Sequence, residues 1–117
     1  MAMGEGKFYF GRFKPWTKGQ RLYDGYNKEY FNHRLPVVHV GFYEMKNCYG
    51  VTFRVDGAKF VSHICLNPLF KHYEQQLCQT LLHEMIHVLH NNKYGHGKKF
   101  KKEIRRLLLL GAFDDTL

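Results

Sequence analysis

The chain has 117 residues, of which 44% are hydrophobic and 24% charged, and its formal net charge is +8 at pH 7. This length fits one domain with a single core, and the composition excludes an intrinsically disordered chain. The longest aliphatic run, Leu107 to Leu110, is too short to span a bilayer, and residues 1–14 lack the apolar stretch of a signal peptide. We therefore expect a cytoplasmic monomer that makes no membrane contact.

Charge and cysteine content limit the partners and the compartment. With 18 Lys and Arg against 10 Asp and Glu, the domain is expected to attract polyanions, nucleic acid first. The alternative is that the charge only keeps the domain soluble. Cys48, Cys65 and Cys78 are odd in number and form no C-x-x-C pair, so they fit neither a disulfide framework nor a cysteine zinc site. We expect Cys65 and Cys78 to be buried and reduced.

The N-terminal region divides into an arm and a helix. Residues 1–16 are rich in glycine and basic residues, which predicts an irregular arm, and residues 17–117 are expected to form the domain. Between residues 17 and 33, apolar side chains recur every three or four positions, which predicts a helix that ends at Leu35-Pro36. The aromatic residues of the arm can stack on single-stranded nucleic acid or, as we favour, pack against the core: Phe8, Phe10, Phe13 and Trp16.

A small sheet is expected to follow the first helix. Residues 37–43 form its first predicted strand. In residues 49–55, apolar residues alternate with Gly50, Thr52 and Arg54, which is typical of a strand buried on one face. Asp56-Gly57 predicts a tight turn, and residues 59–66 its antiparallel partner strand. The pattern predicts a three-stranded antiparallel meander.

Two further helices complete an α+β fold. Asn67 and Pro68 are typical of an N-cap and a first helical position, and the predicted helix runs from there to about residue 91. Its expected core positions are Phe70, Tyr73, Leu77, Leu81, Met85 and Val88 or Leu89. The last helix spans residues 97–110, with Gly111 at its C-terminal cap. Its expected buried residues are Phe100, Ile104, Leu107 and Leu108.

The central signal is the sequence His83-Glu84-Met85-Ile86-His87. Two histidines four residues apart lie on one face of a helix and can bind a single metal ion. Glu84 directly follows the first histidine, so its carboxylate lies beside the ion, where it can accept a proton from the attacking water. The alternative is a polar helix face that carries histidines without any such function.

A catalytic zinc ion uses three protein ligands and keeps one position open for water. The nearby candidates for the third ligand are His90 and His96. His90 lies about 10.5 Å along the helix axis from His83, whereas nitrogens that share one tetrahedral zinc lie about 3.3 Å apart. Residues 91–95 are rich in turn formers and can fold back to present His96. We therefore predict His96 as the third ligand and His90 as a residue at the rim of the site.

The H-E-x-x-H motif, followed by Gly95-His96-Gly97 and then by Lys98-Lys99-Phe100, resembles the metal site of SprT-like zinc metallopeptidases. That family includes the Spartan-type proteases, which digest proteins crosslinked to DNA. The resemblance extends to residues 26–31 with Leu35-Pro36, which look like the family's first helix, and to Leu66-Asn67-Pro68 before the motif. Many longer members carry a cysteine zinc ribbon after the protease domain, a pattern that this sequence does not contain.

The resemblance implies a zincin-like fold and one catalytic Zn²⁺ ion held by His83, His87 and His96, with Glu84 as the general base. The expected function is that of a zinc-dependent metalloendopeptidase, a hydrolase that cleaves a protein or peptide substrate lying along an exposed edge of the sheet. The alternative is a small basic nucleic-acid-binding module whose zinc site is structural or vestigial. A structural zinc ion would need a fourth protein ligand.

DNA is a further expected partner, with single-stranded DNA favoured. The last helix carries a cluster of basic residues: Lys98, Lys99, Lys101, Lys102, Arg105 and Arg106. Such a cluster can track phosphates, which would make binding dependent on salt. The alternative is a solvated helix face whose cations complement the helix dipole. Action on DNA-bound or DNA-crosslinked proteins would place the protein at the nucleoid.

Overall fold

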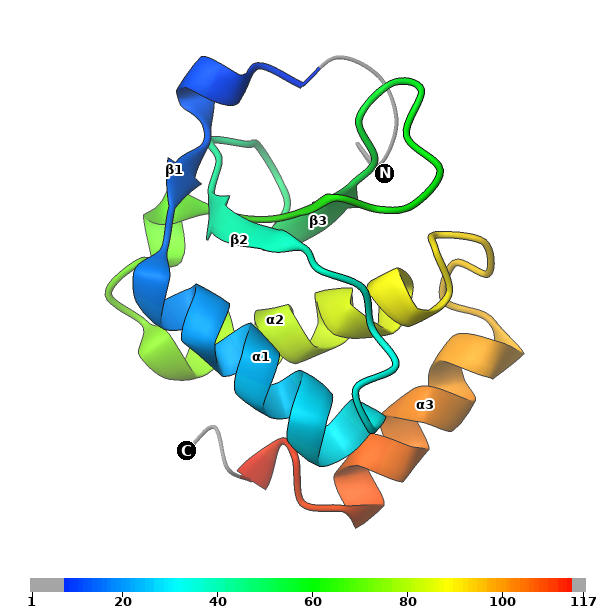
Figure 1. Cartoon of the computed structure of the whole chain (residues 1–117). Helices are drawn as coiled ribbons and strands as arrows, with labels where there is room; N and C mark the ends of the chain where they lie inside the picture. Colours follow the sequence, from blue (N-terminus) through cyan, green and yellow to red (C-terminus); the bar gives the residue numbers. More distant parts are fainter. Residues whose placement is uncertain (1–7, 115–117) are drawn as a thin grey trace.

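Three α-helices and one small sheet make up the chain over residues 8–114, which this computed structural model describes (Figure 1). The helices are α1 (Thr17–Phe31), α2 (Glu74–Leu89) and α3 (Lys98–Leu109). The strands are β1 (Lys14–Pro15), β2 (His39–Phe42), β3 (Gly50–Phe53) and β4 (His63–Leu66), and η1 (Phe10–Arg12) and η2 (Pro68–Phe70) are short 3-10 helices. The predicted α+β class is confirmed. None of the helices in the described part is long and apolar enough to cross a membrane.

The sheet has four strands in the order β1-β2-β4-β3, so the predicted three-stranded antiparallel meander is wrong. β3 and β4 pair antiparallel as expected, across a turn in which Gly57 has a φ of 81°. β2, however, pairs in parallel with β4, and β1 adds to the outer edge of β2. The reason is the connection through residues 43–49, which crosses the end of β4 instead of making a tight hairpin. The Asn67 side chain holds this connection, since its Nδ2 donates to the carbonyl oxygens of Met45 (3.2 Å) and Cys48 (2.9 Å).

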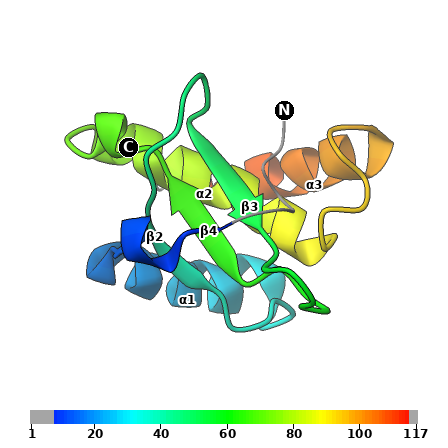
Figure 2. The same cartoon turned by 90° about the horizontal axis from the view of Figure 1, so that it is seen from above.

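Both faces of the sheet are covered. α1 and α2 lie along one face (Figures 1 and 2), where Val40, Ile64 and Leu66 enter the main core. Thr52 lies opposite Ile64 on this same face and is only 4% exposed, so the expectation of a solvent-facing side to this strand is wrong. The alternation of apolar and polar residues correctly assigned side chains to the two faces of the strand. The face that carries Thr52 is nevertheless buried, because α2 packs against it.

The N-terminal segment covers the other face of the sheet. Its residues 8–16 contain η1 and β1, so this part of the predicted arm is not irregular; residues 1–7 lie outside the described residues. The Phe8 ring stacks on Tyr43 at 5.2 Å and lies 4.9 Å from Phe53 and 4.5 Å from His63, measured between centroids. For the aromatic residues of the arm we favoured packing against the core over stacking on nucleic acid. Phe8 packs in this way. Cys65 and Cys78 are buried and free, as predicted.

The helix predicted from Asn67 starts later than expected. Asn67 does act as an N-cap, accepting a hydrogen bond from the Leu69 N–H at 3.0 Å, but the helix that it caps is η2. The chain then turns, and α2 starts at Glu74 with Tyr73 as its N-cap residue. Tyr73, which was expected in the core, is consequently 65% exposed. From Leu77 onwards the predicted stripe of α2 is buried as expected.

α3 closes the fold against α1 and α2. Phe100 and Leu107 are buried as predicted, whereas Leu108 is 56% exposed, which contradicts the expectation. The helix ends at Leu109, and Gly111, with a φ of 78°, follows the C-cap residue Leu110. The Gly111 N–H donates to the Leu108 carbonyl and the Ala112 N–H to the Leu107 carbonyl. This pair of bonds is a Schellman cap, which needs the left-handed conformation that glycine adopts readily.

Candidate metal centre

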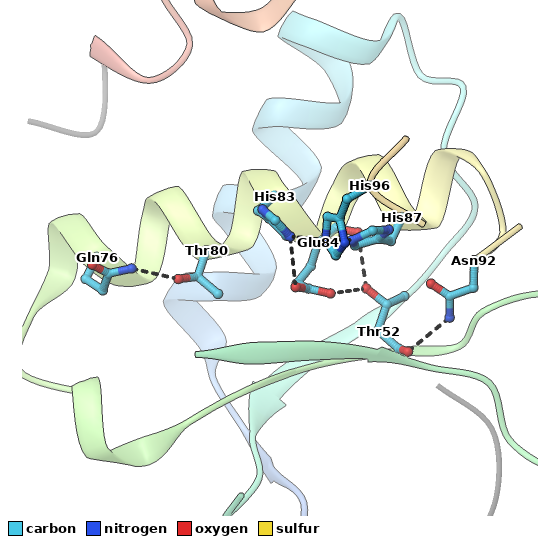
Figure 3. Close-up of polar contacts among 8 residues, drawn as sticks. All are labelled: Thr52, Gln76, Thr80, His83, Glu84, His87, Asn92 and His96. Carbon is cyan, nitrogen blue, oxygen red and sulfur yellow. Dashed lines mark hydrogen bonds and ion pairs between the residues drawn. The ribbon is translucent and has the colours of Figure 1, made fainter. Parts of the chain in front are cut away.

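Helix α2 and the loop after it bring three histidine side chains together (Figure 3). His83 and His87 project from one face of α2, one turn apart, and His96 approaches from the segment that precedes α3. The Nε2 atom of His96 lies 3.1 Å from the Nε2 atoms of both His83 and His87. One donor atom from each residue lies within 4.8 Å of the others, a spacing at which the group can hold a metal ion. The two distances from His96 Nε2, 3.1 Å each, are close to the spacing of about 3.3 Å between nitrogens that bind one tetrahedral zinc.

The surroundings favour the neutral, metal-binding form of two of these imidazoles. Burial, with contributions from the neighbouring histidines, lowers the pKa of His87 to about 4. Burial and the nearby His96 also lower the pKa of His83. The Phe100 ring of α3 supports all three rings, with centroid distances between 4.7 and 5.0 Å. A metal ion binds the deprotonated nitrogen of imidazole, so this environment suits it near neutral pH.

Two consecutive asparagines fix the start of the loop that carries His96. Asn91 and Asn92 have φ values of 51° and 60°, in the left-handed region that asparagine tolerates better than most residues. Asn91 Oδ1 accepts a hydrogen bond from the Val61 N–H (2.9 Å), and Asn92 Nδ2 donates to the Thr52 carbonyl oxygen (3.1 Å). Both bonds tie the end of α2 to the β3–β4 hairpin. The chain therefore returns toward α2 and presents His96 to the other two histidines.

Glu84 lies beneath the histidines and is 5% exposed. The Thr52 hydroxyl oxygen is 2.5 Å from Glu84 Oε1 and 3.2 Å from the Glu84 carbonyl oxygen, while Oε2 lies 3.9 Å from His83 Nε2 (Figure 3). One carboxylate oxygen is thus held by Thr52 and the other faces the histidine group. Burial raises the pKa of Glu84 to about 7, against a smaller lowering by the Thr52 hydroxyl. A carboxyl group with such a pKa can both accept and donate a proton at neutral pH.

A cleft of about 1010 Å³ connects the histidine group with the edge of the sheet. One wall is formed by residues 49–52, which include the first three residues of the edge strand β3. Residues of α2, among them Thr80 and His83, also line the cleft. The opposite wall is apolar and includes Ile104, Leu108 and Phe113. The exposure of Leu108 thus has a structural reason, since its side chain lines this cleft. The cleft therefore extends from the histidine group to the edge strand β3.

The structure brings together all four residues that the sequence indicated: His83, Glu84, His87 and His96. His90 stays outside the histidine group, and its ring lies edge-on to Tyr94 at 5.2 Å between centroids. Thr52 was missed as a site residue. The sequence does show a polar residue between Val51 and Phe53 in a predicted strand. It does not indicate that the Thr52 hydroxyl contacts Glu84.

The basic cluster of α3 is exposed at five of its six positions: Lys98, Lys99, Lys101, Lys102 and Arg105. The sixth, Arg106, is engaged within the fold. Its Nη1 donates to the Tyr30 carbonyl oxygen at 2.7 Å and its Nε to Glu103 at 2.9 Å. Lys99 Nζ lies 4.2 Å from the centroid of the Tyr94 ring, a cation–π contact on the His96 loop. The exposed cations therefore begin directly beside the candidate metal centre.

Comparisons with known proteins agree with the geometry. The sequence model of the SprT-like family matches residues 19–111, which include every residue of the histidine group and Glu84. Searches of curated proteins and of solved structures found no match.

Proposed function

Because the chain belongs to the SprT-like family, we propose that it is a zinc-dependent metalloendopeptidase with His83, His87 and His96 as the ligands of one Zn²⁺ ion. The observation that carries this proposal is the placement of Glu84: its Oε2 lies 3.9 Å from Nε2 of His83, one member of the histidine group, within a cleft that borders a sheet edge. Three imidazoles are a donor set that suits zinc and leaves a coordination position open. A bound zinc ion supplies a Lewis acid that polarises the peptide carbonyl and lowers the pKa of water.

The residues of the chain supply the proton transfers and the positioning. Glu84 Oε2 accepts the proton of the attacking water and later delivers it to the leaving amine, which is the work of a general base followed by a general acid. Thr52 keeps Oε1 occupied, so the carboxylate stays turned toward the reaction. An extended peptide adds to the edge of β3 through backbone hydrogen bonds, which do not depend on its sequence. The Thr52 carbonyl oxygen already accepts a hydrogen bond from Asn92 Nδ2. The peptide therefore forms its backbone hydrogen bonds with the part of β3 nearer to Gly50.

The alternative, a nucleic-acid-binding module with a structural zinc site, requires a fourth protein ligand. Within residues 8–114, the group that can hold a metal has three members. This open set favours the catalytic function over the structural one.

The proposal is tested by incubating the zinc-loaded protein with an unfolded protein substrate, beside the Glu84→Gln variant. We expect the variant to bind zinc as the wild type does and to cleave at a rate lower by a factor of about 10² to 10⁴, because its amide cannot accept the proton. Chelation of zinc should abolish wild-type cleavage. Equal cleavage by the wild type and Glu84→Gln would refute the peptidase proposal.

We further propose that DNA recruits the substrates of this peptidase, through the five exposed cations of α3. Their position supports this: the helix that carries them starts two residues after His96. A protein bound to the same DNA would then be held close to the cleft.

A further inference from the structure

A second, smaller pocket adjoins the main cleft at the N-terminal end of α2. It has a volume of about 360 Å³, and its lining consists of Tyr49, Leu69, Phe70, Tyr73 and Gln76. Tyr49 and Gln76 also line the cleft that contains the histidine group and Glu84. The two cavities therefore share a wall, and a peptide in the cleft can place a side chain in the pocket.

The pocket is apolar and its large side chains are exposed. Leu69, Tyr73 and Tyr49 are 74%, 65% and 55% exposed, and they lie around the half-buried Phe70. The Tyr49 and Phe70 rings are 4.7 Å apart and those of Phe70 and Tyr73 6.5 Å apart, measured between centroids. Exposed apolar side chains that lie together are more typical of a surface that a partner covers than single exposed ones are. Within the described chain, the lining contains no Lys or Arg to neutralise phosphates, which argues against a nucleic-acid strand as the occupant.

Two independent measures give the distance between this pocket and the reaction centre. Along α2, Gln76 and His83 are seven residues apart, which corresponds to about 10.5 Å. Along the sheet edge, Tyr49 and Thr52 are three residues apart, which corresponds to about 10 Å. An extended peptide advances about 3.3 Å per residue. The pocket therefore lies about three peptide residues from the scissile bond.

We propose that this pocket is a specificity subsite that binds one large apolar side chain of the substrate, aromatic in preference, about three residues from the scissile bond. The proposal rests on the peptidase function proposed above. The side chain enters on the side of the bond that faces Tyr49, since Asn92 closes the edge of β3 at Thr52. A substrate ring in the pocket would have the rings of Tyr49, Phe70 and Tyr73 as partners, and aromatic rings attract one another in offset-stacked and edge-to-face arrangements.

The first test measures binding without cleavage. A short fluorescein-labelled peptide of Gly, Ser and Ala that carries one Phe is titrated with zinc-loaded Glu84→Gln protein, and its anisotropy is compared with that of peptides carrying Lys or Ser instead. We expect the Phe peptide to bind about tenfold more tightly than the Ser peptide. Equal affinities for the Phe and Ser peptides would overturn the proposal.

Two substitutions in the pocket, made in the Glu84→Gln background, identify where the Phe side chain binds. Tyr73→Ser removes a ring but keeps a residue favoured at an N-cap, so α2 should still form, and the preference for Phe should fall about fivefold. Leu69→Glu should reverse the preference, so that the Lys peptide binds more tightly than the Phe peptide. The matched control is Leu109→Glu, at an 88% exposed position that lines neither cavity in the described chain. A Phe preference that neither pocket variant alters, or that Leu109→Glu alters equally, would overturn the proposal.

Cleavage by the wild type is a separate measurement that distinguishes the subsite from the peptidase function. Mass spectrometry of digested peptides should find large apolar residues enriched about three positions from the cut, on one side only. Cleavage without such enrichment would overturn the subsite and leave the peptidase function intact. A Phe preference in binding that depends on Tyr73, without cleavage of any peptide, would support the pocket as a peptide site and refute the peptidase function.

Discussion

Hydrogen bonds to single side chains set the orientation of the residues that we assign to catalysis. The Thr52 hydroxyl fixes one oxygen of the Glu84 carboxylate, so the other oxygen faces the histidines. Asn92 fixes Thr52 in turn through the Thr52 carbonyl oxygen. A general base gains its effect from being held within hydrogen-bonding reach of the proton that it accepts. We therefore assign Thr52 a positioning function, which it exerts through the orientation of Glu84.

Replacing Thr52 by Val tests this function because Val has the same shape without the hydroxyl. We expect kcat to fall about tenfold with KM nearly unchanged, since the carboxylate loses its fixed orientation but the peptide contacts remain. Thr52→Ser restores the hydroxyl and should keep most of the activity. Steady-state kinetics on one peptide gives both constants. Equal kcat values for Thr52→Val and Thr52→Ser would contradict the positioning function.

The residues of the site differ in how far the sequence could predict them. His83, Glu84, His87 and His96 lie within one helix and the loop that follows, so helical spacing and turn formers were sufficient to group them. Thr52 is 32 residues away from Glu84, and its contact depends on how α2 packs on the sheet. Local patterns contain no information about that packing.

Among the helices and strands, too, features set by local sequence were predicted, whereas features set by distant contacts were not. The three main helices were predicted because their apolar residues repeat at helical spacing, and each of the strands β2, β3 and β4 lies inside its predicted range. The predicted strand order was wrong because strand pairing depends on the path of the connecting segments, and residues 43–49 cross the end of β4. β1, with two residues, is too short for a pattern to indicate. The break between η2 and α2 was also missed, since the apolar spacing continues across it.

At the scale of elements, the contact between the N-terminal segment and the sheet predicts a pH-dependent stability. His63 of β4 is 6% exposed and lies beneath Phe8, Phe10 and Phe13. Burial, with a smaller effect of the nearby His39, lowers the pKa of His63 to about 4 from the ordinary histidine value of 6.5. Above pH 6.5 the imidazole is neutral in both the folded and the unfolded state. Below pH 6.5 the unfolded chain binds the proton first, so stability falls as the pH decreases toward 4.

Substitution of His63 measures this contribution. Between pH 7 and pH 5, we expect the wild type to lose roughly 2 kcal/mol of unfolding free energy more than His63→Phe loses. Urea unfolding of both proteins without metal, at the two pH values, gives the difference. His72→Gln, at an exposed histidine, is the matched control and should follow the wild type. If His63→Phe lost as much stability as the wild type over this interval, the buried histidine would not be the source.

At the scale of the whole molecule, the net charge of +8 is not spread evenly. Five exposed cations lie on α3, whose first residue follows the candidate metal centre closely. The apolar pocket lies at the other end of the cleft, beside η2 and the start of α2. This arrangement separates a face suited to polyanions from a surface suited to peptide side chains. Net charge could be read from composition, but its distribution relative to the cleft required the fold.

The distribution of charge predicts that α3 binds single-stranded DNA. We expect the double substitution Lys101→Glu/Lys102→Glu to weaken binding about tenfold at moderate salt, because two phosphate contacts are lost. The slope of log K against log salt should decrease by about 1.4, at about 0.7 for each contact with a single strand. Lys28→Glu/Lys46→Glu makes the same change in charge at exposed positions outside α3 and should have a smaller effect. An unchanged slope in the α3 variant, or equal effects of both variants, would contradict DNA binding by this helix.

The central claim is that the three histidines form an open, catalytic zinc centre. X-ray absorption spectroscopy at the zinc edge tests it most directly, using zinc-loaded wild type, His90→Ala and His96→Ala. We expect three imidazole ligands and one oxygen from solvent in the wild type and in His90→Ala, and the loss of one imidazole in His96→Ala. A fourth protein ligand, a sulfur ligand, or the loss of an imidazole in His90→Ala instead of His96→Ala would contradict it.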